Sequence, residues 1–138
     1  MIKNNELIYC LQQKYPGIVH GMDFWVAHPV DSVTFEQTGE AWIVEWRVDG
    51  VAEPTQVELG ELWSQYGAAA TEHVLALEQR QKRDGLLLEA DALVMKLEDS
   101  GQIEQVAAAR KYRQALRDVP KQDGFPFEVQ WPQPPSTE

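Results

Sequence analysis

Apolar residues in this chain recur in some segments with the period of a helix and in others with the two-residue period of a strand. The first segment with helical period lies near the N-terminus. Leu7 and Leu11 recur one turn apart on an apolar face, which predicts a helix over residues 4–14. Asn4 or Asn5 can cap its first turn, because an asparagine side-chain oxygen accepts a hydrogen bond from a backbone N–H left free there. We therefore expect the chain to open with a short amphipathic helix.

Three short segments with strand-like composition follow this helix. They cover residues 24–27, 32–36 and 41–48, and a turn at Thr38-Gly39-Glu40 separates the last two. The third segment has a period of two, and its apolar positions are Trp42, Val44, Trp46 and Val48. Three such strands form a small antiparallel meander, which needs a helix packed on its apolar face to be stable.

The sequence then contains a sharp helix start. Thr55 and Glu58, three residues further on, predict a capping box in which each side chain accepts a hydrogen bond from the other residue's backbone. The apolar positions that follow at helical spacing are Leu59, Leu62, Trp63 and Tyr66. We expect this helix to cover the sheet and Gly67 to end or loosen it.

A long helical stretch is expected from Ala68 to about residue 98, and its middle, residues 78–84, is entirely polar. A wholly polar helical segment cannot be buried in a core, so we expect it to bridge two parts of the molecule. Beyond it, two apolar stripes predict an antiparallel helical hairpin. The stripe positions are Leu86, Ala90, Leu93 and Leu97 on the first helix and Ala109, Tyr112, Leu116 and Val119 on the second. After Gly124, four prolines favour an extended tail.

These elements predict an α+β fold. It consists of a small antiparallel β-meander packed on helices, followed by a long helix and an antiparallel helical hairpin with an extended C-terminal tail rich in proline and aromatic residues. We divide the chain into a small α+β head, residues 1–66, and a second part, residues 67–138, which holds the bridging helix, the hairpin and the tail. A chain of 138 residues has room for this arrangement but only for a modest core.

Charge and hydropathy narrow the classes of function. The formal net charge is −10, and the first 70 residues carry ten acidic and three basic side chains. Because phosphate contacts need concentrated lysine and arginine, we expect no nucleic-acid partner. No apolar run approaches the roughly 20 residues that span a bilayer, and the N-terminus lacks a signal peptide's long apolar stretch. We therefore expect a soluble protein of the cytoplasm that has no membrane partner.

Candidate catalytic chemistry is sparse. The three histidines, His20, His28 and His73, match no dense metal-binding motif, and the sequence has no glycine-rich phosphate loop. Cys10 is the only cysteine, and it lies in an apolar helical stretch without an activating cation or histidine close in sequence. We expect a non-enzymatic protein with no cofactor and no metal site, in which Cys10 is a buried structural thiol.

Two features of the C-terminal part each allow two interpretations. Arg110, Arg113 and Arg117 form a cationic row at i, i+3 and i+7, which can pair with acidic residues across the hairpin or bind a partner. Trp131 lies in an extended, proline-stiffened tail, where it can anchor a partner or fold back with the neighbouring aromatic residues onto the hairpin.

Several C-terminal segments are similar to the phage tail assembly chaperone family. They are Arg-Asp-Gly-Leu-Leu-Leu-Glu-Ala-Asp at 83–91, Tyr-Arg-Gln-Ala-Leu-Arg-Asp-Val-Pro at 112–120, Gly-Phe-Pro at 124–126 and Trp-Pro at 131–132. The Tyr-Arg-Gln-Ala-Leu-Arg-Asp run followed by Trp-Pro is the specific part of this resemblance. The resemblance covers about 50 residues.

The head resembles a second small family, the XkdW type of prophage tail-cluster proteins. The matching segments are residues 14–16, 23–24, 45–46 and 54–59, with Trp63 following. Their order and spacing agree with that family, and the resemblance supports the fold of the head more than a particular function.

The first resemblance implies a phage tail fibre assembly chaperone. Such a protein acts without ATP, binds the fibre protein and assists its folding, trimerisation or attachment. The alternatives are a small structural adaptor retained in the phage tail or baseplate, and an acidic inhibitor that mimics DNA. The sequence leaves a homo-oligomer open. The residues expected to bind the partner are Tyr112, Arg113, Leu116, Arg117, Phe125, Phe127 and Trp131.

Overall fold

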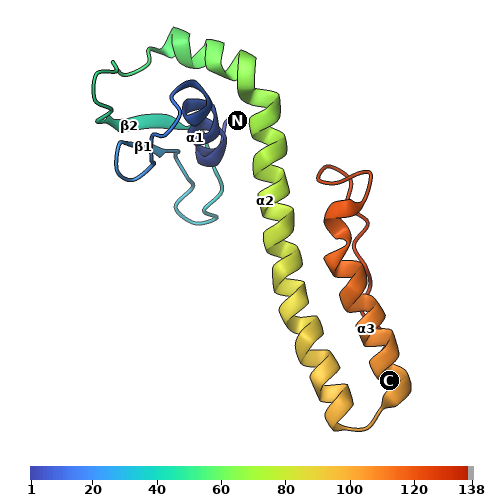
Figure 1. Ribbon diagram of the computed structural model, residues 1–138. Coiled ribbons are helices and arrows are strands. Elements are labelled where there is room, and N and C mark those ends of the chain that lie inside the picture. The colour runs from blue at the N-terminus through green and yellow to red at the C-terminus, as the bar shows by residue number, and fades with distance from the viewer. Residues whose placement is uncertain (137–138) are drawn as a thin grey trace. The chain divides into compact units, whose positions relative to one another are not determined.

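The computed structural model describes residues 1–136, so residues 137 and 138 of the second predicted part lie outside the described residues. Its elements, in chain order, are α1 (Asn4–Lys14), β1 (Phe24–Ala27), β2 (Trp42–Trp46), α2 (Gln56–Asp99), α3 (Ile103–Arg117) and the short 3-10 helix η1 (Val119–Lys121). Figure 1 shows the small antiparallel sheet and the helices of this α+β fold. The predicted fold class is confirmed.

The chain forms two compact units, Met1–Val74 and Leu75–Glu138, and helix α2 contributes to both. Each unit has apolar clusters of its own. The domain boundary placed after residue 66 stays a prediction, because α2 continues through that position without a break.

The core of the first unit joins α1, the sheet and the first turns of α2. Phe24 and Leu11 are fully buried in it, and the ring centre of Trp46 lies 5.8 Å from that of Phe24. The other buried members of this cluster are Leu7, Cys10, Ile18, Val26, Leu62 and Ala70. A two-stranded sheet has little stability of its own, so this apolar cluster holds the strands in place.

Helix α1 begins at Asn4 as expected, but its cap differs from the prediction. The N-cap residue is Lys3, whose backbone N–H donates to Glu6 Oε2 at 2.8 Å. Asn4 and Asn5 already lie inside the helix, so neither can cap it. Glu6 accepts the backbone N–H of the N-cap residue, as the glutamate of a capping box does.

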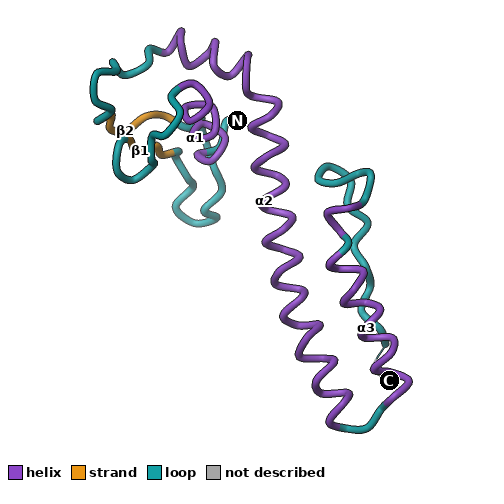
Figure 2. Tube along the Cα trace, in the orientation of Figure 1, coloured by secondary structure: helices purple, strands orange, loops and turns teal. Residues whose placement is uncertain are grey.

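The predicted strand at residues 32–36 is wrong, and Figure 2 shows the segment between β1 and β2 as a loop. Asp31 Oδ1 accepts hydrogen bonds from the backbone N–H groups of Val33 and Thr34, each at 2.8 Å. Phe35 adopts a φ of +59°, and its N–H donates to the Asp31 carbonyl at 3.0 Å. This aspartate-centred turn offers the backbone local partners in place of a strand ladder, so the sheet has two strands rather than three.

Strand β2 is shorter than expected, and its predicted apolar face is only partly right. Trp46 and Val48 pack against the core, whereas Trp42 and Val44 do not. It pairs antiparallel with β1, and the register shifts between Trp25 and Val26. Because a bulge changes which side chains face the core, Ile43 packs against the apolar cluster while Trp42 and Val44 are exposed. Regular alternation along β2 therefore misassigned three apolar side chains, Trp42, Ile43 and Val44.

Gly67 does not end the helix that starts at Gln56. Helix α2 continues to Asp99, and a Cβ atom built at Gly67 would lie 2.8 Å from Cδ2 of the Trp63 ring. Carbon atoms in contact prefer a separation of about 3.5–4.0 Å. Gly67 thus makes room for an indole ring one turn away, which explains a glycine inside a continuous helix.

The predicted capping box at the start of α2 is confirmed. The Thr55 N–H donates to Glu58 Oε2 at 2.7 Å, and the Glu58 N–H donates to Thr55 Oγ1 at 3.2 Å. The hydrogen bond from the Thr55 backbone is the main reason that the pKa of Glu58 lies below its ordinary value of 4.5. Because the pKa of Glu58 is lower in the folded state than in the unfolded state, the ionised carboxylate stabilises the fold at a pH above the unfolded-state pKa. This stabilisation is lost as the pH falls from the unfolded-state pKa through the folded-state pKa.

We therefore expect Glu58→Gln to flatten part of the acid-induced loss of stability. Glutamine keeps the geometry of the capping box but cannot be protonated. Thermal unfolding should show a smaller fall in melting temperature for the variant than for the wild type between about pH 5 and pH 3. Superimposable acid profiles would show that the box contributes nothing to this pH dependence.

Cys10 is confirmed as a buried thiol, with 1% of its surface exposed. Burial, with a smaller contribution from the charge of Glu6, raises the pKa of this thiol to about 11. Because the thiolate is the reactive form, we expect no reaction between the native protein and a disulfide reagent at neutral pH. Unfolding in urea should release one thiol per chain, whereas immediate reaction of the native protein would contradict this burial.

Candidate partner-binding site

The second unit is a helical hairpin whose apolar seam contains most of the predicted stripe positions. It also contains Val94 and Val106, which the stripes did not include, and the predicted stripe residue Val119 lies in η1 beyond the end of α3. The end of α2 and the whole of α3 lie side by side in Figure 1, joined by a turn in which Gly101 has a φ of +69°. Near the turn, the seam holds Val94, Leu97, Val106 and Ala109, with Leu93 packed against them. Further from the turn, it holds Ala90, Tyr112 and Leu116, with Leu86, Leu87 and Trp131 packed against them.

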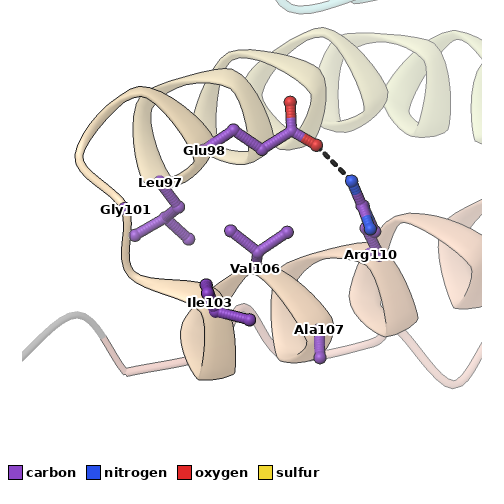
Figure 3. Close-up of a pocket in the computed structure, with 7 residues that line it drawn as sticks. All are labelled: Leu97, Glu98, Gly101, Ile103, Val106, Ala107 and Arg110. Carbon is purple, nitrogen blue, oxygen red and sulfur yellow. Dashed lines mark hydrogen bonds and ion pairs between the residues drawn. The ribbon is translucent and has the colours of Figure 1, made fainter.

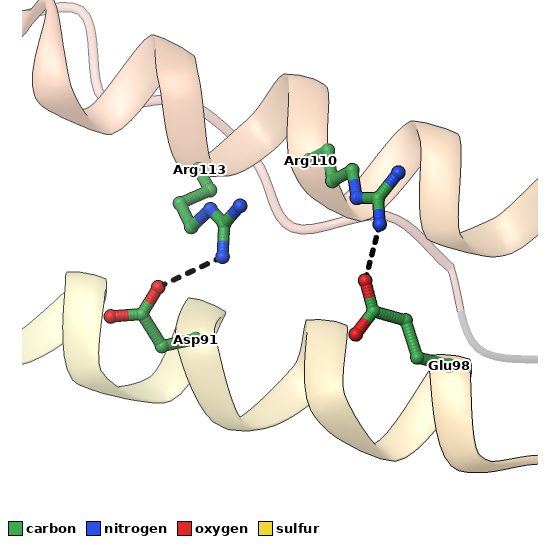
Figure 4. A network of polar contacts seen from close by, with 4 residues as sticks. All are labelled: Asp91, Glu98, Arg110 and Arg113. Carbon is green, nitrogen blue, oxygen red and sulfur yellow. Dashed lines mark hydrogen bonds and ion pairs between the residues drawn. The ribbon is translucent and has the colours of Figure 1, made fainter.

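The arginine row lies along one side of this seam. Arg113 Nη1 lies 3.1 Å from Asp91 Oδ1, and Arg110 pairs with Glu98. Figure 4 shows both ion pairs between the two helices. These pairs are partly exposed, so each contributes little to stability. Arg117 is exposed and forms no ion pair with any residue in the described part of the chain. The row therefore provides two links across the hairpin and leaves Arg117 available to a partner.

Trp131 folds back onto the hairpin, which is one of its two predicted arrangements. It is partly buried against the cluster of Ala90, Tyr112 and Leu116. Lys82 Nζ lies 4.4 Å from the centre of its ring. A cation over an exposed aromatic face contributes about 0.5–1 kcal/mol. Figure 1 shows the tail running back beside α3 after η1.

The polar middle of α2 receives the start of this tail. The guanidinium of Arg80 lies 5.1 Å from the ring centre of Phe125, and Gln79 Nε2 donates to the Pro126 carbonyl at 3.3 Å. Long cationic side chains can cover aromatic surface while their charges stay in water. The polar segment, which was expected only to bridge two parts of the molecule, therefore also contacts the aromatic start of the tail. Phe127 in the same tail remains 60% exposed.

The seven residues expected to bind a partner lie at three depths. Leu116 and Tyr112 are buried in the seam, whereas Arg117 and Phe127 are exposed. The partly buried members are Arg113, Phe125 and Trp131. Burial, with a further contribution from Glu89, raises the pKa of Tyr112, so its hydroxyl is protonated at neutral pH. The exposed members can contact a partner directly, and the buried pair holds the surface in shape.

A groove at the closed end of the hairpin was not expected from the sequence. It has a volume of about 340 Å³, and Figure 3 shows Leu97 from α2 and Ile103 and Val106 from α3 along it. Ile103 is 81% exposed. In the sequence, the isoleucine among polar residues at the start of α3 could have indicated an exposed apolar surface there.

Neither a cluster of potential metal ligands nor a helix able to span a membrane is found among the described residues. No group of three or more histidine, cysteine, aspartate or glutamate side chains in residues 1–136 could hold a metal ion. Among those residues there is also no helix with both the length and the apolar character needed to cross a bilayer.

Comparison with known proteins concerns both units. Residues 76–136 match the family model of the phage tail assembly chaperone protein, and residues 7–71 match the family model of the XkdW protein. Both resemblances noted in the sequence are confirmed. No curated protein and no solved structure matches the chain. The chain therefore combines a segment similar to XkdW with a segment similar to the tail assembly chaperone family, and the two matches support a role in phage tail assembly.

Proposed function

We propose that this protein is a chaperone for phage tail fibre assembly and that the second unit binds the fibre protein. The observation that carries the proposal is the extent of the chaperone match, because residues 76–136 include the whole hairpin and the described tail. The surface formed by these elements holds the aromatic and cationic residues described above.

Two exposed side chains are the strongest candidates for direct contact. Phe127 presents an aromatic ring to solvent, and Arg117 is a cation without an ion-pair partner among residues 1–136. Large aromatic and arginine side chains account for much of the binding energy at protein interfaces. We infer that these two residues grip the fibre chain, while Tyr112 and Leu116 support them from the seam.

Such binding explains assistance without ATP. An unfinished fibre chain exposes strand edges and apolar seams, which associate wrongly before the correct partner chains arrive. A chaperone that binds the unfinished chain more tightly than the finished trimer lowers the concentration of free edges. Trimerisation then releases the chaperone, because the trimer covers the surfaces that it held.

The test is co-expression with the tail fibre protein of the same phage. We expect Phe127→Ser combined with Arg117→Glu to reduce the yield of soluble fibre trimer several-fold, because the double variant removes one contact and reverses another. Val57→Ser, at an exposed apolar position in the first unit, is the control and should leave the yield unchanged. Equal trimer yields from the wild type, the double variant and Val57→Ser would contradict the proposal that Phe127 and Arg117 bind the fibre.

Mass spectrometry of purified phage particles separates a chaperone from a retained adaptor. A chaperone leaves when assembly ends, so it should be absent or present far below the amount of fibre. A fixed ratio to the fibre in mature particles would assign the chain to the particle itself and would overturn the proposed function.

A further inference from the structure

The last part of the tail, residues 129–135, lies along the hairpin as a strap without regular secondary structure. Its turn is fastened by the side chain of Gln122, which donates to the Gln130 carbonyl at 2.9 Å and accepts from the Gln130 N–H at 2.8 Å. Beyond this point Trp131 is the anchor, through its packing on the seam and the cation of Lys82. The strap is therefore held by a small number of separate contacts.

The strap does not fill the space beneath it. A cavity of about 360 Å³ lies between the strap and α2, with Leu86, Ala90 and Leu93 in its wall. A second cavity, of about 250 Å³, lies between the strap and α3, with Ala108 and Ala115 in its wall. Tyr112, Pro132 and Gln133 border both cavities.

Both spaces open to solvent, because Ala108 and Gln133 on their walls are exposed. Apolar atoms that face such a space lack the dispersion contacts that a closely packed segment would give them. Gln133, the residue between the two cavities, is exposed and polar, so it contributes little apolar contact. The groove between α2 and α3 can thus accept a bulkier apolar segment than the strap supplies.

The geometry points to a peptide-binding groove between α2 and α3 that takes an extended segment rich in aromatic residues and proline from a partner chain. In the free protein the strap occupies this groove in place of the partner. Trp131 followed by Pro132 and two further prolines shows which chemistry the groove accepts, because proline holds a chain extended at low entropic cost. The partner's role as a tail protein rests on the proposed function, but the groove itself can be tested without that partner.

The probe is a fluorescent synthetic peptide that copies residues 124–136 of this chain, titrated into full-length protein. In the wild type the strap competes at the high effective concentration of a tethered segment, so binding should be weak. Trp131→Ala removes the anchor of the strap, and we expect the peptide to bind this variant at least about tenfold more tightly. Gln133→Leu should pin the strap in the underfilled groove and weaken binding below that of the wild type.

Two further proteins keep the test decisive if Trp131→Ala disturbs the fold. Gln122→Ala removes the two hydrogen bonds to Gln130 without touching the seam, and it should also bind the peptide more tightly than the wild type. A peptide whose own tryptophan is replaced by alanine should bind none of the proteins. Equal peptide affinity for the wild type and both loosened variants, or no binding to any of them, would overturn the proposal.

Sedimentation of the wild type identifies the alternative occupant. If the wild type is monomeric over the concentration range of the titration, this supports the proposal that the groove binds a different partner chain. A concentration-dependent dimer that disappears in Trp131→Ala would assign the groove to the strap of a second copy and overturn the inference. None of these measurements uses the fibre protein, so their failure leaves the co-expression test of the proposed function intact, and the reverse also holds.

Discussion

Replacing Phe24 by alanine should lower the free energy of unfolding of the first unit by about 3–5 kcal/mol. Phe24 is fully buried, and its ring centre lies 5.8 Å from that of Trp46 and 5.5 Å from that of His20. Removing the ring forfeits its transfer free energy and leaves a cavity that these neighbouring rings cannot fully close. Urea unfolding followed by circular dichroism measures the loss.

The chain offers a matched control for this substitution in Phe35. It is also a phenylalanine in the first unit, but it is 76% exposed. Phe35→Ala should change the free energy of unfolding by less than about 0.5 kcal/mol, because it removes no core contact. Similar losses from the two variants would show that burial of Phe24 does not govern the stability of this unit.

Hydrogen exchange tells whether the two units depend on each other. Each unit has its own apolar clusters, so Phe24→Ala should lower amide protection in α1 and the sheet first. Amides in α3, which belongs to the second unit, should keep most of their protection. A uniform loss of protection would mean that the shared helix α2 makes the chain unfold as one cooperative block.

Structural features that depend only on residues close together in the sequence could be predicted from it. Thr55 and Glu58 form their capping box because both partners lie within one helical turn. The apolar stripes of the hairpin also agree with the structure, since helical periodicity places residues such as Ala90 and Leu116 on one face regardless of what lies elsewhere.

The predictions of secondary structure were wrong where a single neighbouring group determined the backbone conformation. Asp31 turned strand-like sequence into a loop by accepting two backbone hydrogen bonds. Gly67 looked like a helix end, but the ring of Trp63 explains why it has no side chain. In β2 the bulge belongs to the pairing with β1, so no pattern within one strand could reveal it.

The arrangement of the candidate site could be predicted only in part. Opposite charges at matching positions on the two helices indicated that Arg110 and Arg113 could pair across the hairpin, and they do. Prolines indicated that the tail is extended, but extended backbone carries no information about where it lies. The cations of Arg80 and Lys82 that receive its aromatic rings are distant in sequence, so only the folded chain identifies them.

Leu116→Ala should have the largest effect on the second unit, with a loss of about 2–5 kcal/mol in its free energy of unfolding. Leu116 is fully buried beside Ala90 and Tyr112, and Trp131 packs against the same cluster. Because Trp131 packs against the cluster that contains Leu116, the variant should also loosen the strap. Thermal unfolding and hydrogen exchange in α3 measure these two effects.

Leu88→Ala is the control, because Leu88 lies on the same hairpin but is 73% exposed. It should leave the unfolding transition almost unchanged. In co-expression at a temperature where both variants are folded, Leu116→Ala should lower the yield of fibre trimer and Leu88→Ala should not. If a folded Leu116→Ala protein supported the full yield, the shape of the seam beneath the strap would have no part in binding the fibre, and only the exposed residues Arg117 and Phe127 would remain as its grip.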